Sequence, residues 1–320
     1  MTPTLDDRIL GVLYGAACAD ALGGPVEGLD HRELSARYGR VASMLPYPKP
    51  PAEHAQFTNA PGSVTDDTRL HRIHCDALIA GGGHTLAGDL ALAIDGWRDA
   101  HRGDLERSFL EEYHYAALYR EAKLPFGGHA TNGAIMANHA VGVVHAGDPR
   151  GAYRTAFELA YLSDGYGKDA AAIHAAAVAA ALRPGATARA AIDEALAAAE
   201  AERRDGPYWA ETVRTHAWAR FEGRPNHELV ARALELVERH QGDDAATLRD
   251  ALYPVLLVSP VGSDAAQTLA VAFAMLVRCD GDYRDAVIEC VAYGRDNDSY
   301  ATVAGAIAGA LHGVTAVPAE

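Results

Sequence analysis

The chain has 320 residues, which is enough for one large domain or two domains of ordinary size. Hydrophobic residues make up 49% of the chain and aromatic residues only 7%, so alanine, leucine and valine supply most of the core. The net charge of −15 argues against binding to the nucleic-acid backbone, which requires a basic surface. We therefore expect no nucleic-acid partner.

The cysteines and the N-terminal residues indicate a cytoplasmic protein. The four cysteines form no CxxC pair, so neither a zinc site nor a disulfide framework is indicated. Residues 1–8 are acidic and lack the basic start and apolar core of a signal peptide. No charge-free apolar run approaches the roughly 18–20 residues of a membrane span. We expect a reducing compartment and no membrane partner.

Apolar residues recur at helical spacing along nearly the whole chain, and no βαβ alternation interrupts them. This periodicity predicts an all-α fold. The first predicted helix runs from Arg8 to about Leu22 and ends at a Gly-Gly-Pro breaker. Later predicted helices cover residues 66–80, 84–102, 104–122, 133–145 and 149–163, an alanine-rich stretch ending at 182, and residues 186–204, 216–221, 227–240, 265–278 and 282–293.

Residues 62–68, Gly-Ser-Val-Thr-Asp-Asp-Thr, place two adjacent carboxylates between hydroxyl side chains at the start of a predicted helix. Adjacent carboxylates repel each other, so ionising both Asp66 and Asp67 requires a counter-charge. A hard divalent cation with oxygen ligands would supply that charge. The alternative interpretation is an ordinary helix N-cap without a ligand.

Residues 294–299, Gly-Arg-Asp-Asn-Asp-Ser, show the same chemistry near the C-terminus. Asp296 and Asp298 stand two residues apart, and Ser299 follows directly. The small residues of 300–311 predict a helix that other helices approach closely, so both carboxylates lie at a helix N-terminus, where the dipole favours negative charge. Two such helix starts from opposite ends of the chain could meet around one or two cations. The alternative is two unrelated N-caps.

Two further segments carry candidate site residues. Glu27 lies in a Gly/Pro turn directly after the first predicted helix, where it is either a site residue or a solvated loop residue. Residues 126–133, Phe-Gly-Gly-His-Ala-Thr-Asn-Gly, form a glycine-rich loop that opens a helix and offers backbone N–H groups to an anion. His129 and Asn132 are the side chains there that could touch a ligand. A plain helix-linking turn has the same composition.

Taken in order, these motifs resemble those of the ADP-ribosylglycohydrolase family, which includes the hydrolase acting on ADP-ribosylated dinitrogenase reductase and the crystallin J1 relatives. The matching segments are the opening helix and turn, the Thr-Asp-Asp-Thr motif, the central Asn-Gly segment and the terminal signature with its helix, at residues 9–27, 65–68, 132–136 and 294–313. The resemblance covers most of the chain. It implies that residues 1–320 form a single domain, a compact all-α bundle of many helices.

The resemblance also implies a binuclear Mg²⁺ site, with Mn²⁺ as the alternative ion. The implied ligands are Thr65, Asp66 and Asp67 on one side and Asp296, Asp298 and Ser299 on the other. The implied reaction is hydrolysis of a ribosyl C1″ glycosidic bond, with Asp66 or Asp67 as general acid or base and Glu27 gating the site or orienting the substrate. The implied substrate contacts are Gly128, His129, Thr131 and Asn132. The expected partner is an ADP-ribosylated protein or a small ribosyl glycoside.

Two departures from the family pattern keep other functions open. Thr131 stands where glycine is common, and residues 162–167 lack the histidine that many members place at the diphosphate. Asp164 lies in that region instead and would repel a diphosphate. A metal-dependent hydrolase of another N- or O-glycoside, such as a nucleoside, is therefore an alternative. A non-catalytic, crystallin-like protein is another, although retention of all six implied ligands argues against it.

Overall fold

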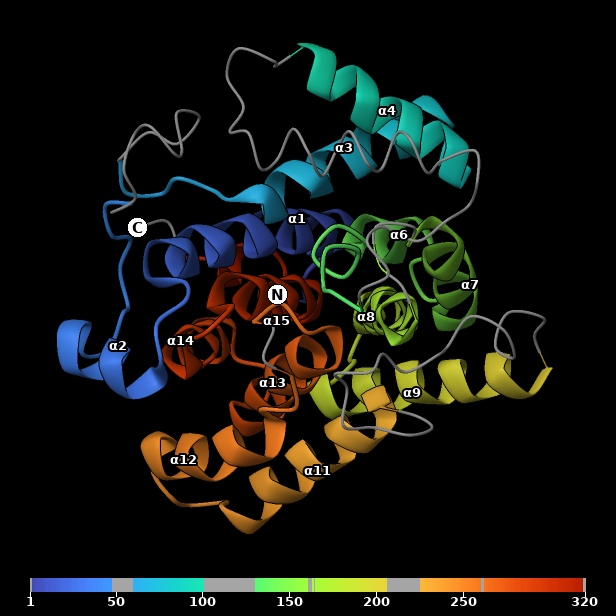
Figure 1. Ribbon diagram of the computed structural model, residues 1–320. Helices are drawn as coiled ribbons and strands as arrows, with labels where there is room; N and C mark the ends of the chain where they lie inside the picture. The colour runs from blue at the N-terminus through green and yellow to red at the C-terminus, as the bar shows by residue number, and fades with distance from the viewer. Residues whose placement is uncertain are drawn as a thin grey trace.

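The computed structural model describes residues 2–47, 60–100, 130–160, 163, 165–205, 225–259 and 262–318. Within these ranges the secondary structure is helical, with two isolated β-bridges and no strand, which confirms the predicted all-α fold. Figure 1 shows the helices packed around a central group. The α-helices are α1 (Leu5–Gly23), α2 (His31–Tyr38), α3 (Asp66–Ala80), α4 (Ala87–Ala100), α6 (His139–Val144), α7 (Pro149–Leu159), α8 (Tyr166–Ala181), α9 (Ala188–Asp205), α11 (Pro225–Arg239), α12 (Ala245–Leu256), α13 (Ala265–Arg278), α14 (Tyr283–Tyr293) and α15 (Asn297–His312).

Local capping signals set many of the helix ends. Thr4 caps α1 through a capping box with Asp7, and α1 ends in the 3₁₀ turn η1 (Gly24–Val26), which contains Pro25. Asp264 and Asp282 cap α13 and α14 through their side chains. The predicted helices over residues 104–122 and 216–221 lie outside the described residues.

The helix predicted over residues 133–145 is shorter than expected. Residues 133–138 form successive turns, and α6 begins only at His139. The reason is tertiary, because the start of this segment is attached to two other parts of the chain. The backbone N–H of Asn132 donates to the carbonyl of Ser263 (2.9 Å), and that of Ala134 donates to the hydroxyl of Ser163 (3.1 Å).

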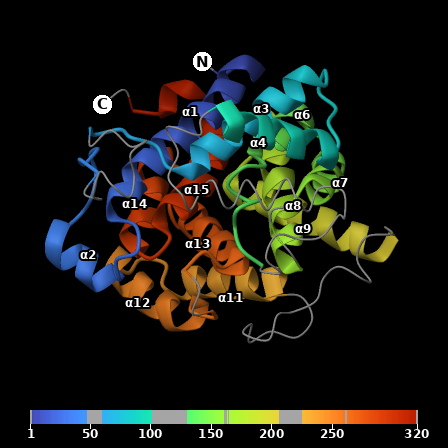
Figure 2. The same ribbon diagram turned by 45° about the horizontal axis from the view of Figure 1, so that its top comes forward.

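Helices α1 and α15 form the centre of the fold and run antiparallel in close contact (Figures 1 and 2). Their surfaces meet through glycines. A Cβ atom on Gly11 would lie 2.2 Å from the carbonyl oxygen of Gly309, and one on Gly15 would lie 2.5 Å from that of Gly305. The two backbones therefore touch with no side chain between them. This contact places the C-terminal end of α1 beside the N-terminal end of α15.

The helices α8, α13 and α14 surround this pair, and their alanines allow close packing. Every residue of α15 from Asn297 to Leu311 is buried. In Figure 1, α3 and α4 lie on one side of the α1–α15 pair, whereas α11 and α12 lie on the opposite side. The site described below forms where α3 meets the ends of α1 and α15.

Among the described residues, one segment, Leu5–Val26, is by length and composition apolar enough to cross a membrane, with a mean hydropathy of 1.4. The sequence patterns predicted no membrane span there. This segment is α1 with η1, and 67% of its apolar window is buried inside the protein, largely against α15. Its composition is what a core helix of a packed bundle requires.

Candidate metal centre

The N-terminus of α15 presents two carboxylates after a sharp backbone turn. Gly294 has φ of +79° and Arg295 has φ of +61°, so the chain reverses immediately before the helix. Asp296 occupies the N-cap position, and Asp298 lies in the first turn with only 2% of its surface exposed. The positive end of the helix dipole lowers the cost of placing negative charge there.

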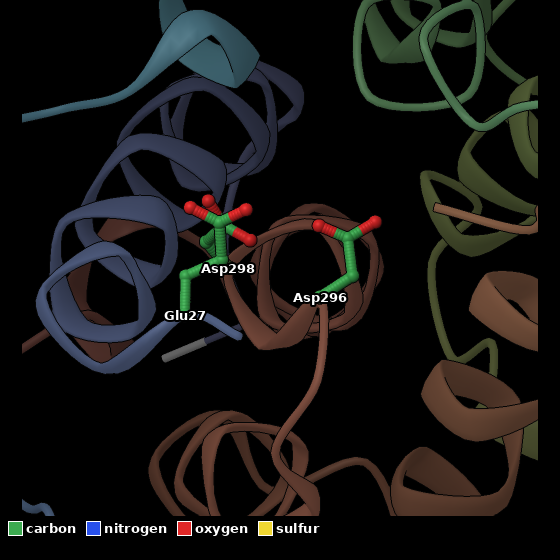
Figure 3. A group of neighbouring side chains, drawn as sticks. All are labelled: Glu27, Asp296 and Asp298. Atoms are coloured by element: carbon green, nitrogen blue, oxygen red, sulfur yellow. The ribbon is translucent and has the colours of Figure 1, made fainter. Parts of the chain in front are cut away.

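Glu27 reaches the same place because its loop is attached to this turn by a pair of backbone hydrogen bonds. The N–H of Gly28 donates to the carbonyl of Arg295 (2.6 Å), and the N–H of Arg295 donates to the carbonyl of Leu29 (2.7 Å). As a result, Glu27, Asp296 and Asp298 each offer a carboxylate oxygen within 4.8 Å of the others. Figure 3 shows the three side chains pointing toward the same side of the helix ends.

The other acidic motif meets this group through Ser299. The Ser299 hydroxyl donates to Oδ2 of Asp67 (3.2 Å), and the Ser299 N–H donates to Oδ1 of Asp298 (2.9 Å). Thr65 caps α3 by accepting from the Asp67 N–H (3.3 Å). The Ser299–Asp67 hydrogen bond therefore brings the two acidic helix starts of the sequence together.

Asp20, which the sequence reading did not select, holds the α3 motif in place. This fully buried residue of α1 accepts hydrogen bonds from the N–H of Thr65 (3.0 Å), and from both the N–H (3.2 Å) and the hydroxyl of Thr68. The sequence contains a feature that points to a role for Asp20, because it is the only charged residue between Ile9 and Val26. A charge in such a helix requires buried partners.

The carboxylates at this site need positive charge. Burial and the charge of Asp20 raise the pKa of Asp67 well above its usual range, and burial and the charge of Glu27 do the same for Asp298. Burial and Glu27 also raise the pKa of Asp296 to about 6. Oδ1 of Asp67 is buried without a hydrogen-bond partner among the described residues. A hard cation with oxygen ligands would satisfy both the charge and this orphaned atom.

The remaining predicted site residues lie in different places. Asp66 is half-buried beside Asp67 and is not a member of the three-carboxylate group. Asn132 is buried, and its amide donates to Oδ2 of Asp296 (2.6 Å). The carbonyl of Thr131 accepts from the Ser163 hydroxyl (2.8 Å). Gly128 and His129 lie outside the described residues.

A cleft of about 530 Å³ opens beside the carboxylates. This volume is within the range of about 300–1,000 Å³ that is usual for small-molecule sites. Glu27 and Asp296 lie at the end of the cleft that borders the acidic group. The other side chains lining the cleft are those of Asp30, Tyr253, Ser263 and Arg295.

Comparison with known proteins identifies the family. The family model described as ADP-ribosylglycohydrolase matches residues 1–320. The chain belongs to the ADP-ribosylglycohydrolase family. This confirms the resemblance inferred from the motifs and makes the chain a member of a family of glycosidic-bond hydrolases. The family is in general metal-dependent and acts on ADP-ribosylated substrates.

Two further comparisons cover nearly the whole chain. The chain is 28% identical over 327 residues to the uncharacterized protein YegU of Escherichia coli (strain K12), covering 97% of this chain and 89% of that protein. It also resembles a solved structure titled "ADP-ribosylglycohydrolase-related protein complex", with a TM-score of 0.60 and 23% identity over 98% of this chain and 90% of that one. The second likeness shows the shared fold. The single domain over residues 1–320 stays a prediction.

Proposed function

We propose that this protein is a divalent-metal-dependent hydrolase that cleaves the glycosidic bond of a ribosyl substrate, with an ADP-ribosylated protein or small molecule as the first candidate. The observation that carries the proposal is the meeting of Glu27, Asp296 and Asp298 within 4.8 Å at the edge of a cleft. One of these carboxylates is buried and two are half-buried, and like charges so close together are unfavourable without a cation between them. A scaffold protein has no need of such a group.

Two cations, Mg²⁺ or Mn²⁺, are proposed to lie between the two acidic motifs. The residues that would hold them are Thr65, Asp66 and Asp67 at the start of α3 and Asp296, Asp298 and Ser299 at the start of α15, with Glu27 beside them. All seven offer oxygen atoms, which suits these hard ions. When bound, such ions neutralise the carboxylates and lower the pKa of a water molecule in the site toward neutrality.

The protein's own groups have separable roles in this proposal. Asp66 or Asp67 accepts the proton of the attacking water as general base, and Asp66 is the more exposed of the two. Glu27 lines the cleft and orients the ribose. The surrounding carboxylates stabilise the positive charge that develops on the sugar in an oxocarbenium-like transition state.

The rest of the cleft is proposed to bind the remainder of the substrate. Arg295 offers a cation to an anionic group, and Tyr253 offers an aromatic side chain to a ring. Asp30 and Ser263 add polar contacts. We also propose that the protein acts in the cytoplasm, because its four cysteines are free and a reducing compartment keeps them so.

A direct test combines binding and turnover. The protein, loaded with Mg²⁺, is titrated calorimetrically with ADP-ribose, and the titration is repeated after chelation. Release of ADP-ribose from arginine- and serine-modified peptides is then followed by chromatography. Asp66→Asn is expected to fail in turnover, whereas Asp193→Asn, an exposed substitution on α9, should match the wild type.

Each outcome of this test has a distinct meaning. Metal-dependent binding of ADP-ribose and release from a peptide would support the proposal. Metal binding without affinity for ADP-ribose would indicate that the substrate is another glycoside, such as a nucleoside. Failure of the wild-type protein to bind Mg²⁺ or Mn²⁺ would refute the metal centre.

A further inference from the structure

We propose that Thr268 is a positioning residue for the metal centre, acting through Asn132 on Asp296. The inference rests on the proposed function, because it assigns a support to one of the proposed metal ligands. Thr268 lies on α13, and Asn132 lies in the segment before α6. Neither residue lines the cleft beside the carboxylates.

The amide of Asn132 divides its two N–H donors between two acceptors. Nδ2 donates to Oδ2 of Asp296 at 2.6 Å and to Oγ1 of Thr268 at 3.0 Å. Asn132 is 3% exposed and Thr268 is fully buried, so water does not compete for these bonds. The bond to Thr268 holds the Asn132 amide in a single orientation, with its nitrogen facing the carboxylate of Asp296.

The hydroxyl of Thr268 is itself oriented by the backbone of its own helix. Its Oγ1 donates to the carbonyl of Asp264, the N-cap residue of α13, at 3.0 Å. The hydroxyl proton is thereby occupied, and a lone pair of Oγ1 faces Asn132. Without this hydroxyl the amide could turn its oxygen toward Asp296, which would replace a hydrogen bond by the repulsion of two acceptors.

The backbone around Asn132 is held to the same end of α13. The Asn132 N–H donates to the carbonyl of Ser263 (2.9 Å), and the N–H of Ala265 donates to the carbonyl of Ala130 (3.0 Å). The segment and the helix therefore move as one unit, with Thr268 setting the side-chain orientation. This support fixes Oδ2 of Asp296 and with it the direction in which the carboxylate faces Glu27 and Asp298.

Outer partners of this kind matter for metal sites, because they fix the direction in which a ligand presents its lone pairs. Their removal typically costs about 10–100-fold in metal affinity. Asn132 is such a partner for Asp296, and Thr268 holds its amide from a helix that contributes no proposed ligand of its own.

The experiment measures the affinity for Mn²⁺ by calorimetry for Thr268→Val, Thr268→Ser and Thr302→Val. Thr268→Val keeps the shape and removes the hydroxyl, so its affinity should fall by about 10–100-fold. Thr268→Ser keeps the hydroxyl and should restore the wild-type affinity. Thr302 is a matched control, because it is fully buried on α15 and its hydroxyl has no hydrogen-bond partner among the described residues. Thr302→Val should bind Mn²⁺ like the wild type.

Thermal unfolding in chelator separates loss of metal binding from loss of folding. If Thr268→Val does not fold, the smaller Thr268→Ala takes its place with the same expectation. Wild-type Mn²⁺ affinity in a folded variant without the hydroxyl would overturn the inference while leaving the proposed function intact. Absence of Mn²⁺ binding in the wild-type protein would overturn both.

Discussion

Gly23 is in backbone contact with Asp298. A Cβ atom on Gly23 would lie 2.5 Å from the Cα of Asp298 and 2.7 Å from its backbone nitrogen. The last residue of α1 and the first turn of α15 therefore meet with no room for a side chain. This contact fixes where the N-terminal half of the chain meets the C-terminal acidic motif.

Gly23→Ala should destabilise the protein and disturb the metal centre. The added methyl group must displace the backbone of Asp298, and overpacking of this kind typically costs about 1–3 kcal/mol. The measurement is the free energy of unfolding in denaturant, followed by Mn²⁺ titration. Gly96→Ala is the matched control, because Gly96 lies exposed within α4 with open space around its Cα. The free energy of unfolding of Gly96→Ala should rise by about 0.5–1 kcal/mol. Equal stability of the two variants would contradict the contact between Gly23 and Asp298.

Gly294→Ala should detach the Glu27 loop from the start of α15. The residue has φ of +79°, and a Cβ atom there would lie 2.5 Å from the carbonyl oxygen of Leu29. We expect loss of stability and of metal-dependent turnover, measured by unfolding and by product release. Gly39→Ala shares the left-handed backbone, with φ of +65°, but its Cβ would meet nothing within 4 Å. Gly39→Ala should therefore lose only the free energy of unfolding that backbone strain costs, about 1 kcal/mol. Its turnover should be that of the wild type.

The thermal stability of Asp298→Asn should no longer depend on Mn²⁺. A ligand at 100 times its Kd stabilises a folded protein by about 2.7 kcal/mol, so Mn²⁺ should raise the Tm of the wild type and chelator should reverse the change. The variant should lose this response and all metal-dependent turnover. In chelator it should be at least as stable as the wild type, because one buried charge facing Glu27 and Asp67 has been removed. A full Mn²⁺ response in the variant would show that Asp298 is not a ligand.

Four buried histidines form a second cluster of titratable side chains. His71 and His74 lie on α3, His139 on α6 and His174 on α8. The rings of His71 and His139 stack with centroids 3.5 Å apart, and His174 meets His139 edge-on at 5.8 Å. Burial lowers all four pKa values, to about 4 for His71, to about 3 for His74 and His174, and well below the usual 6.5 for His139.

This cluster should make the fold sensitive to acid. Between pH 6.5 and about 4 the unfolded chain binds protons at these histidines and the folded protein does not, so the free energy of unfolding falls as the pH falls. Each histidine contributes up to about 1.4 kcal/mol per pH unit in this window. The free energy of unfolding of His174→Leu, relative to that of the wild type, should therefore rise by about 1.4 kcal/mol for each pH unit below 6.5. A stability difference independent of pH, measured by denaturant unfolding from pH 7 to 4.5, would contradict this.

Local sequence signals determined the helices and the chemistry of the site. The Gly-Gly-Pro breaker after α1 and the capping residues Asp264 and Asp282 act within one turn, so their effects could be read from neighbouring residues. The two acidic motifs indicated a hard cation by residue type alone. Periodicity likewise predicted the all-α fold, because most helices here bury an apolar face or are apolar all round.

Tertiary contacts decided which side chains meet. Glu27 joins Asp296 and Asp298 only because backbone hydrogen bonds attach its loop to the turn before α15. Asn132, expected to touch substrate, donates to Asp296 across 164 positions of sequence, and contacts of that segment with residues 163 and 263 delay the start of α6. Such pairings depend on how closely α1 and α15 pack through their glycines. That depends on the summed packing of the whole bundle, which no local pattern encodes.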